Sequence, residues 1–152
     1  MKKTLLYIIA GAMALFSCNN DKDLVHVRLA DNALVVNPTP GGAMLHYALP
    51  DDPDIAGIHV RYNDCDGNPM LRTASALVDS LKLIGFNEAT ENIKGEVTIQ
   101  FRDGSESAPI PITFSTDDSD AISSIKSMKV ESGWEGFSIN YQAPEGTKGL
   151  FH

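Results

Sequence analysis

The sequence is poor in the residues that most often form disulfides and reactive sites. Its 152 residues include two cysteines, four histidines and one tryptophan. Two cysteines exclude a framework of several disulfides, so the packed core must hold the fold together. The sequence also lacks a glycine-rich phosphate loop and the Gly-x-Ser-x-Gly motif that exposes a catalytic serine. We therefore expect a protein that is not an enzyme and holds no cofactor.

Basic residues are scarce as well. The chain has 12 Lys and Arg against 20 Asp and Glu, which gives a formal net charge of -8. Without a leader that carries Lys2 and Lys3, 10 basic residues face 20 acidic ones and the charge becomes -10. An acidic surface repels the phosphates of nucleic acids and anionic lipid headgroups. This balance argues against nucleic-acid binding.

No apolar run reaches the length of about 20 residues that spans a bilayer. The apolar run Leu5–Phe16 follows two lysines, which is typical of a secretory leader. Residues 15–18, Leu-Phe-Ser-Cys, resemble the lipobox of bacterial lipoprotein signal peptides, with Leu at −3, a small residue at −1 and Cys at +1. The alternative is an ordinary signal peptide followed by an incidental cysteine.

The resemblance to a lipobox predicts how the first 23 residues are divided into segments. We predict a lipoprotein signal peptide over residues 1–17, lipid attachment at Cys18 and a short polar tether over 18–23. The membrane, reached through the N-terminal lipid, is then the first expected partner. Cys65 remains as a free thiol, and no neighbour in the sequence indicates that it is activated.

Short segments of alternating hydrophobicity fill the chain from Leu24 onward. Such period-2 segments predict strands with one buried face, and they lie at 43–49, 58–62, 81–83, 97–101 and 110–114. Asp66-Gly67 and Asp103-Gly104 stand between segments as hairpin turns. Pro109 and Pro111 predict that the last segment is an edge strand. The pattern indicates an all-β sandwich with no convincing amphipathic helix.

One of these segments recurs at a distance of 94 residues. Gly42–Pro50, GAMLHYALP, reappears as Gly136–Pro144, GFSINYQAP, and Val36 matches Val130 at the same offset. A period near 94 suits a sandwich of about 100 residues repeated in tandem. Gly57-Ile58-His59 has a further counterpart in Gly149-Leu150-Phe151-His152, after a slightly shorter loop.

The repeat defines the expected domains. We predict a β-sandwich over 24–115, a Ser- and Asp-rich linker over 116–124 and the truncated start of a second copy over 125–152. Two or three strands cannot enclose a core. We therefore expect either that the chain is a fragment, which we favour, or that its C-terminal part folds poorly.

With these residues in view, a resemblance can be named. The segments that carry it are Pro40-Gly41-Gly42, Tyr47–Pro50, Ala74-Ser75, Asp79-Ser80-Leu81 and Gly85-Phe86. They resemble the fibronectin type III-like N-terminal domain of Bacteroidetes surface lipoproteins, a domain of unknown function. Tyr47 and Tyr141 stand where type III modules place a core Trp, and the usual tyrosine of the sixth strand is missing near 93–96.

The resemblance implies a location and a role. Proteins of this kind often continue into a further type III-like domain and a discoidin-like domain, and are encoded beside outer-membrane glycan-uptake systems. The resemblance therefore implies a lipid-anchored protein of the outer membrane, on the cell surface. Its implied partners are extracellular glycans or outer-membrane glycan-uptake proteins.

Polar clusters in the sequence give little support for a metal site. The loop 63–68 has carboxylates at alternate positions, as a calcium loop does. In a calcium loop that starts at Asp64, however, the sixth position should be glycine and is Pro69 here. The acidic stretches 51–54 and 117–120 are typical of solvated loops. His46 and His59 are expected on outward faces of neighbouring strands, close enough to approach each other, yet without a third ligand. We predict no metal site.

Trp134 is the sole tryptophan, and it falls in a turn of the second copy. It could stack on a sugar ring or seal an interface between modules, and its place near the end of a sandwich favours the second role. The overall hypothesis is a non-enzymatic, lipid-anchored stalk that serves carbohydrate binding or glycan uptake. One alternative is the spacer of a surface glycoside hydrolase, and another is an adhesin or pilus-type subunit.

Overall fold

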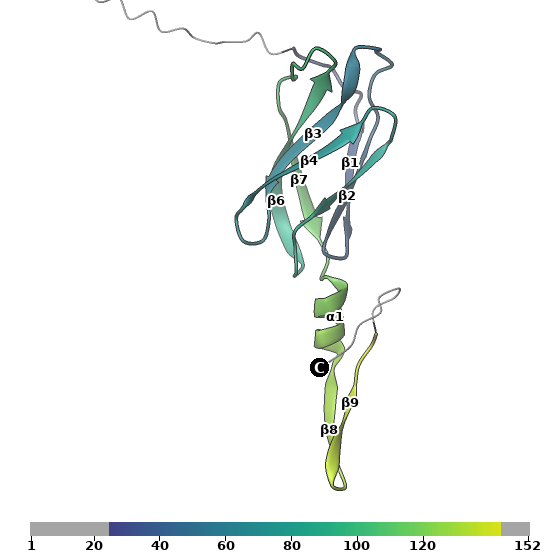
Figure 1. Cartoon of the computed structure of the whole chain (residues 1–152), viewed down its shortest axis with the longest axis vertical. Helices are drawn as coiled ribbons and strands as arrows, with labels where there is room; N and C mark the ends of the chain where they lie inside the picture. The colour runs from purple at the N-terminus through teal and green to yellow at the C-terminus, as the bar shows by residue number, and fades with distance from the viewer. Residues whose placement is uncertain (1–24, 144–152) are drawn as a thin grey trace, which may run out of the picture.

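The computed structural model describes residues 25–143, and the predicted signal peptide, Cys18 and the tether lie outside this range. Seven strands form a sandwich, and a helix and a two-stranded hairpin follow (Figure 1). The elements are β1 (Leu34–Thr39), β2 (Gly42–Tyr47), β3 (Ile55–Asn63), β4 (Pro69–Ser75), β5 (Ser80–Ile84), β6 (Thr90–Phe101), β7 (Ile110–Thr116), α1 (Asp120–Ser127), β8 (Lys129–Gly133) and β9 (Gly136–Asn140). Within the described range, no helix is both long and apolar enough to cross a membrane.

Two antiparallel sheets face each other. One has the order β1-β2-β5 and the other the order β4-β3-β6-β7, which is the strand arrangement of a fibronectin type III sandwich. The predicted all-β sandwich is confirmed. The proline-containing strand β7 lies at an edge of its sheet, as predicted, because Pro111 has no N–H to give to a central ladder.

The core follows the alternation in the sequence. In β2 and β3, every second side chain is buried between the sheets while its neighbours face outward. The fully buried side chains of the core are Ala43, Leu45, Ile58, Val60, Leu83, Val97 and Ile99. Both predicted hairpin turns are present, with Gly67 and Gly104 at φ values of 81° and 84°.

Two tyrosine hydroxyls join the sheets along the side where β4 and β5 face each other. The Tyr62 hydroxyl in β3 donates to the Ile84 carbonyl at 2.7 Å and accepts from the Ile84 N–H at 2.9 Å. The Tyr47 hydroxyl in β2 donates to the Ser75 carbonyl at 2.9 Å. The Tyr62 ring also stacks on Phe86 and meets Phe114 edge to face. These bonds cross between the sheets in a chain that lacks the usual sixth-strand tyrosine.

A short helix, α1, begins within the predicted linker 116–124, where the sequence showed no convincing amphipathic pattern. The Ser and Asp residues of this stretch cap the helix. The Ser119 hydroxyl accepts the N–H of Ile122 at 3.4 Å, and Asp120 lies in the first turn. The helix ends at Ser127, where the Ser127 hydroxyl accepts the Gln142 N–H at 2.8 Å. Eight residues are too few for a clear helical period in the sequence.

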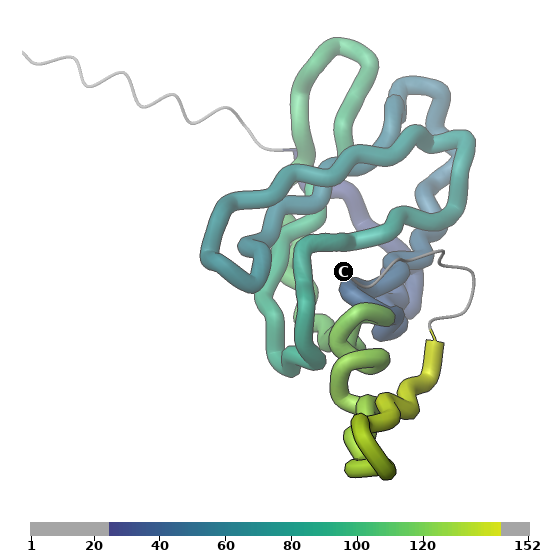
Figure 2. The backbone as a smooth tube through the Cα atoms, turned by 60° about the horizontal axis from the view of Figure 1, so that its bottom comes forward, coloured from purple at the N-terminus to yellow at the C-terminus, as the bar shows by residue number. Residues whose placement is uncertain are grey.

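The helix and the hairpin β8–β9 project from one end of the sandwich (Figures 1 and 2). Among the described strands, β8 and β9 pair only with each other. All ten residues of the two strands are exposed, in contrast to the buried strands of the sandwich.

Candidate functional site

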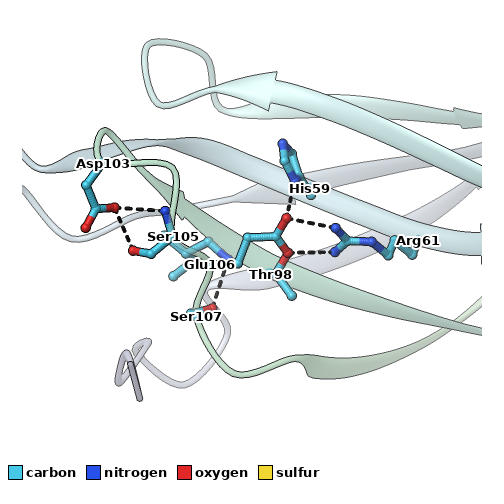
Figure 3. Close-up of polar contacts among 8 residues, drawn as sticks. His59, Arg61, Thr98, Asp103, Ser105, Glu106 and Ser107 are labelled. Carbon is cyan, nitrogen blue, oxygen red and sulfur yellow. Dashed lines mark hydrogen bonds and ion pairs between the residues drawn. The ribbon is translucent and has the colours of Figure 1, made fainter. Parts of the chain in front are cut away.

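A polar cluster lies on the outer face of the four-stranded sheet, where the β6–β7 loop folds back over the strands (Figure 3). Glu106, from this loop, accepts two hydrogen bonds from the Arg61 guanidinium, at 2.8 and 2.9 Å. The Thr98 hydroxyl donates to Glu106 Oε2 at 2.8 Å, and His59 Nδ1 lies 3.0 Å from Oε1. His59 and Arg61 face outward from β3, and Thr98 does so from β6.

The local sequence explains why Glu106 reaches this position. Asp103 accepts hydrogen bonds from the Ser105 N–H at 2.8 Å and the Ser105 hydroxyl at 2.6 Å, which closes the turn. On the other side, the buried Ser107 hydroxyl accepts the N–H of Ile99 at 2.9 Å. Two fixed serines therefore hold Glu106 between them, and its carboxylate lies over β3 and β6 (Figure 3).

The electrostatics of this cluster favour the charged form of the carboxylate. The hydrogen bonds from Arg61 lower the pKa of Glu106 to about 2 against the opposing effect of burial, with Thr98 and His59 adding to the lowering. The same contact raises the pKa of Arg61. A carboxylate that stays ionised at neutral pH cannot serve as a general acid. The cluster can hold the loop on the sheet and present a polar surface.

The acid stability of the sandwich tests this cluster. Because the pKa of Glu106 is lowered from 4.5 to about 2, its stabilising effect is complete above pH 4.5 and is lost as the pH falls towards 2. The Glu106 side chain is 30% exposed and that of Arg61 is 43% exposed, so we expect Glu106→Gln to lower the free energy of unfolding by about 1–2 kcal/mol at pH 7. Urea unfolding of the wild type and the variant between pH 2 and 7 measures this difference and its pH dependence. Glu131→Gln, in the hairpin, is the control, and an unchanged acid slope in Glu106→Gln would contradict the prediction.

A groove of about 750 Å³ lies beside the cluster on the same sheet face. Apolar side chains form part of its lining, and Leu71 among them is 54% exposed. Arg61, Lys94 and Glu96 add charges of both signs. An open groove of mixed character suits an extended ligand bound across strands, but the residues that line it include no exposed aromatic ring for stacking on a sugar.

A second groove, of about 890 Å³, lies at the end of the sandwich opposite the helix, between the β2–β3 and β4–β5 loops. Leu77 is 93% exposed at its wall, and Asp51, Asp52 and Asp79 make its rim acidic. Neither groove was anticipated from the sequence, because each is formed by loops or strands that are distant along the chain.

The structure does not bring His46 and His59 together, so this prediction is wrong. His46 lies in β2 of the three-stranded sheet, whereas His59 lies in β3 of the four-stranded sheet. Consecutive strands in a sandwich can belong to different sheets, and the two outward faces are then on opposite sides of the molecule. Between Val25 and Ala143, no group of three or more His, Cys, Asp or Glu side chains is placed to hold a metal ion.

Three other residues discussed as candidates in the sequence, Asp64, Cys65 and Trp134, lie in turns. Asp64 accepts the backbone N–H groups of Asp66 and Asn68, at 2.9 and 2.8 Å, and these bonds lower the pKa of Asp64. Its carboxylate therefore closes the turn. Cys65 is exposed and free in the same turn, and Trp134 is 95% exposed at the tip of the β8–β9 hairpin.

The facing sheets and the strand order define a β-sandwich module of the fibronectin type III class, with a polar outer face. The model of a family described as a domain of unknown function, DUF4959, matches residues 30–116, more than half of the chain. The chain belongs to this family.

One solved structure among those similar to the chain is a computationally redesigned β-sandwich protein. It is 26% identical, with a TM-score of 0.41, and the match covers 56% of this chain and 90% of that one. No curated protein matches the chain.

Proposed function

We propose that this chain is a non-enzymatic surface protein, anchored to the outer membrane by a lipid on Cys18, whose sandwich spaces a binding region from the membrane. The supporting observation is that the chain enters and leaves the sandwich at opposite ends. Val25 bridges Ser107 in the β6–β7 loop, whereas Asp117, after β7, bridges Pro40 in the β1–β2 turn. The helix then continues away from the sandwich (Figure 1).

Hydrogen bonds hold the outgoing segment on the sandwich. The Ser119 N–H donates to the Asn87 carbonyl at 2.8 Å, and the Asp118 carboxylate accepts the Ala89 N–H at 2.9 Å. Lys126 in α1 lies 2.7 Å from the same carboxylate. These contacts join the β5–β6 loop, the exit segment and the helix, so the helix leaves in a defined direction. A fixed exit is what a semi-rigid spacer requires.

Gly41 allows the outgoing segment to approach closely. A Cβ atom at this position would lie 3.2 Å from the Phe86 carbonyl oxygen and 3.4 Å from the Ser119 Cβ, and the φ of Gly41 is +69°. A glycine is therefore suited both to the turn and to the contact. The β1–β2 turn therefore contacts the segment through which the chain leaves the sandwich.

The ligand class in this proposal is carbohydrate, with extracellular glycans or outer-membrane glycan-uptake proteins as partners. It rests on the resemblance to Bacteroidetes surface lipoproteins. Within this proposal, the open groove on the four-stranded sheet is the surface where such a ligand would bind, through polar and charged side chains rather than by stacking on an aromatic ring.

Lipid labelling in cells tests the anchor. We expect the wild-type chain to incorporate a labelled fatty acid and to sediment with the outer membrane, because Cys18 is its lipid attachment site. Cys18→Ala should lose the label and the membrane association, whereas Cys65→Ala, which removes the other cysteine, should keep both. A label that persists in Cys18→Ala, or an unlabelled wild-type chain, would refute the anchor.

A further inference from the structure

Each sheet of the sandwich has two edge strands, and the edges of β1 and β7 are protected. Edge strands carry N–H and C=O groups that can pair with another chain, so natural sheets usually block them. β1 and β7 contact each other along one side of the sandwich. Each also contains a proline, Pro38 or Pro111, which has no N–H to offer to an added strand. This side of the sandwich is therefore unsuited to strand addition.

The edge of β5, on the other side, is occupied by side chains of the facing sheet. The Tyr62 hydroxyl bonds both the N–H and the C=O of Ile84. Arg72 Nε donates to the Lys82 carbonyl at 3.2 Å. These bonds use backbone groups that an added strand would need, so β5 is blocked as well.

β4 is the edge strand of the sandwich that keeps polar backbone groups available. The Ala76 N–H donates to the Ala56 carbonyl at 2.9 Å, which shows that even-numbered residues of this strand bond to β3. The N–H and C=O groups of Leu71 and Thr73 therefore point away from β3. Among the described residues, no hydrogen bond outside the strand ladders uses these four groups. We call Leu71–Ser75 the open edge of the sandwich.

Exposed apolar side chains gather beside the open edge. Leu71 is 54% exposed on β4, and Leu77, two residues after the strand, is 93% exposed. Between Val25 and Ser119, six large apolar side chains are exposed. Four of them lie on β4, on β5 or in the loop that joins these strands: Leu71, Leu77, Val78 and Ile84. Apolar surface beside an unpaired strand edge is typical of a site where another strand is added.

The charges near the open edge allow a second copy of the chain to approach. The chain has 20 Asp and Glu against 12 Lys and Arg, so two copies repel each other over much of their surface. β4 contains no acidic residue, and its single charged residue is Arg72. β5 likewise has no acidic residue and one basic residue, Lys82. Two acidic copies can therefore meet here without a carboxylate on either strand.

We propose that the open edge pairs antiparallel with the open edge of a second copy and joins the two four-stranded sheets into one. Pairing centred on Thr73 places Leu71 opposite Ser75 of the partner subunit. Arg72 then lies opposite Ala74 of the partner subunit, so two like charges do not face each other. Because the pairing is two-fold symmetric, it uses both open edges, and the joined sheet ends at the proline-containing β7 of each copy. Association therefore stops at the dimer.

The antiparallel pairing also fixes how the two sandwiches are oriented. It reverses one sandwich relative to the other, so their entry ends, marked by Val25, point in opposite directions. The dimer therefore joins copies that are free of the membrane or that stand on two facing membranes. This inference goes beyond the spacer proposal and does not depend on Cys18, since the pairing uses the sandwich alone.

Cysteine cross-linking tests the pairing and its register. In the 152-residue chain with Cys18→Ser and Cys65→Ser, Thr73→Cys supplies the only cysteine, and no lipid is attached. The Cα atoms of a hydrogen-bonded antiparallel pair lie about 5.5 Å apart, which a disulfide can span. We therefore expect a covalent dimer after mild oxidation. Thr113→Cys is the matched control, because it is exposed on the β7 edge beside Pro111 and should remain monomeric.

Sedimentation equilibrium of the same cysteine-free chain measures the dimer directly. Thr73→Pro removes an N–H that points away from β3, so the sandwich should fold while the dissociation constant of the dimer rises about 10-fold or more. Leu71→Lys, at an exposed position, should weaken the dimer by placing a charge at the interface. Thr113→Pro, on the unpaired side of β7 near Pro111, should leave the dissociation constant unchanged.

Three results would overturn the inference. The cysteine-free chain could remain monomeric at every concentration, which includes the case of an open edge that binds only a strand of another protein. The dimer could persist unchanged with both Thr73→Pro and Leu71→Lys. Phe137→Ser, in the hairpin, could abolish the dimer, which would place the contact on β8–β9. Each result is independent of the labelling of Cys18, so a failed anchor and a failed dimer are distinguishable.

Discussion

Gly42→Ala is expected to lower the free energy of unfolding of the sandwich by about 3 kcal/mol or more. The added Cβ would lie 2.0 Å from the Leu83 carbonyl oxygen and 3.1 Å from its carbonyl carbon, both backbone atoms. No side-chain rotation relieves such a contact, so β2 and β5 must separate. Separation weakens their hydrogen bonds and opens the core beneath Leu45, which is 0% exposed.

Urea unfolding followed by circular dichroism measures this effect. Gly136→Ala is the matched control, because it makes the same change at the repeat-related position with no atom within 4 Å. In the 152-residue chain the control should retain the wild-type midpoint. If both variants unfold at the same urea concentration as the wild type, β5 does not lie against Gly42 as the structure has it.

Tyr62→Ala should lower the free energy of unfolding by about 3–5 kcal/mol, because it removes a buried ring that packs against both Phe86 and Phe114. The ring centroids of Phe86 and Phe114 lie 6.0 and 5.7 Å from that of Tyr62. Tyr62→Phe keeps the ring but removes the hydroxyl that bonds both polar backbone groups of Ile84. Loss of these two bonds should cost about 1–3 kcal/mol.

The pair of Tyr62 variants separates ring packing from hydrogen bonding between the sheets. Phe137→Ala provides the control, since it deletes an aromatic ring that is 71% exposed in the hairpin and should leave the unfolding of the sandwich unchanged. Equilibrium unfolding in urea gives all three values. A Tyr62→Phe variant as stable as the wild type would show that the hydroxyl does not hold β5 to β3.

Local patterns in the sequence predicted most of the sandwich. Alternation placed Leu45, Ile58 and Val97 in the core, because side chains on a strand point to opposite faces in turn. The turns at Gly67 and Gly104 followed from a backbone that glycine adopts easily. Pro111 indicated the edge strand, since proline lacks the N–H that an inner ladder needs.

Other features depend on contacts between distant parts of the chain. The assignment of β2 and β3 to different sheets separates His46 from His59, although alternation alone is consistent with neighbouring strands. Glu106 meets Arg61 across 45 residues of sequence, and no local pattern links them. The hydrogen bonds of Tyr62 to Ile84 likewise form only when the two sheets pack. The short helix was missed because its Ser- and Asp-rich cap has the composition of a loop.

The sequence by itself determined which side chains face the core, where the turns of the sandwich lie and that the pattern of Gly42–Pro50 recurs at Gly136–Pro144. These features follow from the short-range geometry of a strand. Only the tertiary structure decided how the strands divide between the sheets, which charges meet on the outer face and which strand edge lies open. Those outcomes depend on the packing of one sheet against another, and packing brings together residues whose separation along the chain carries no signal.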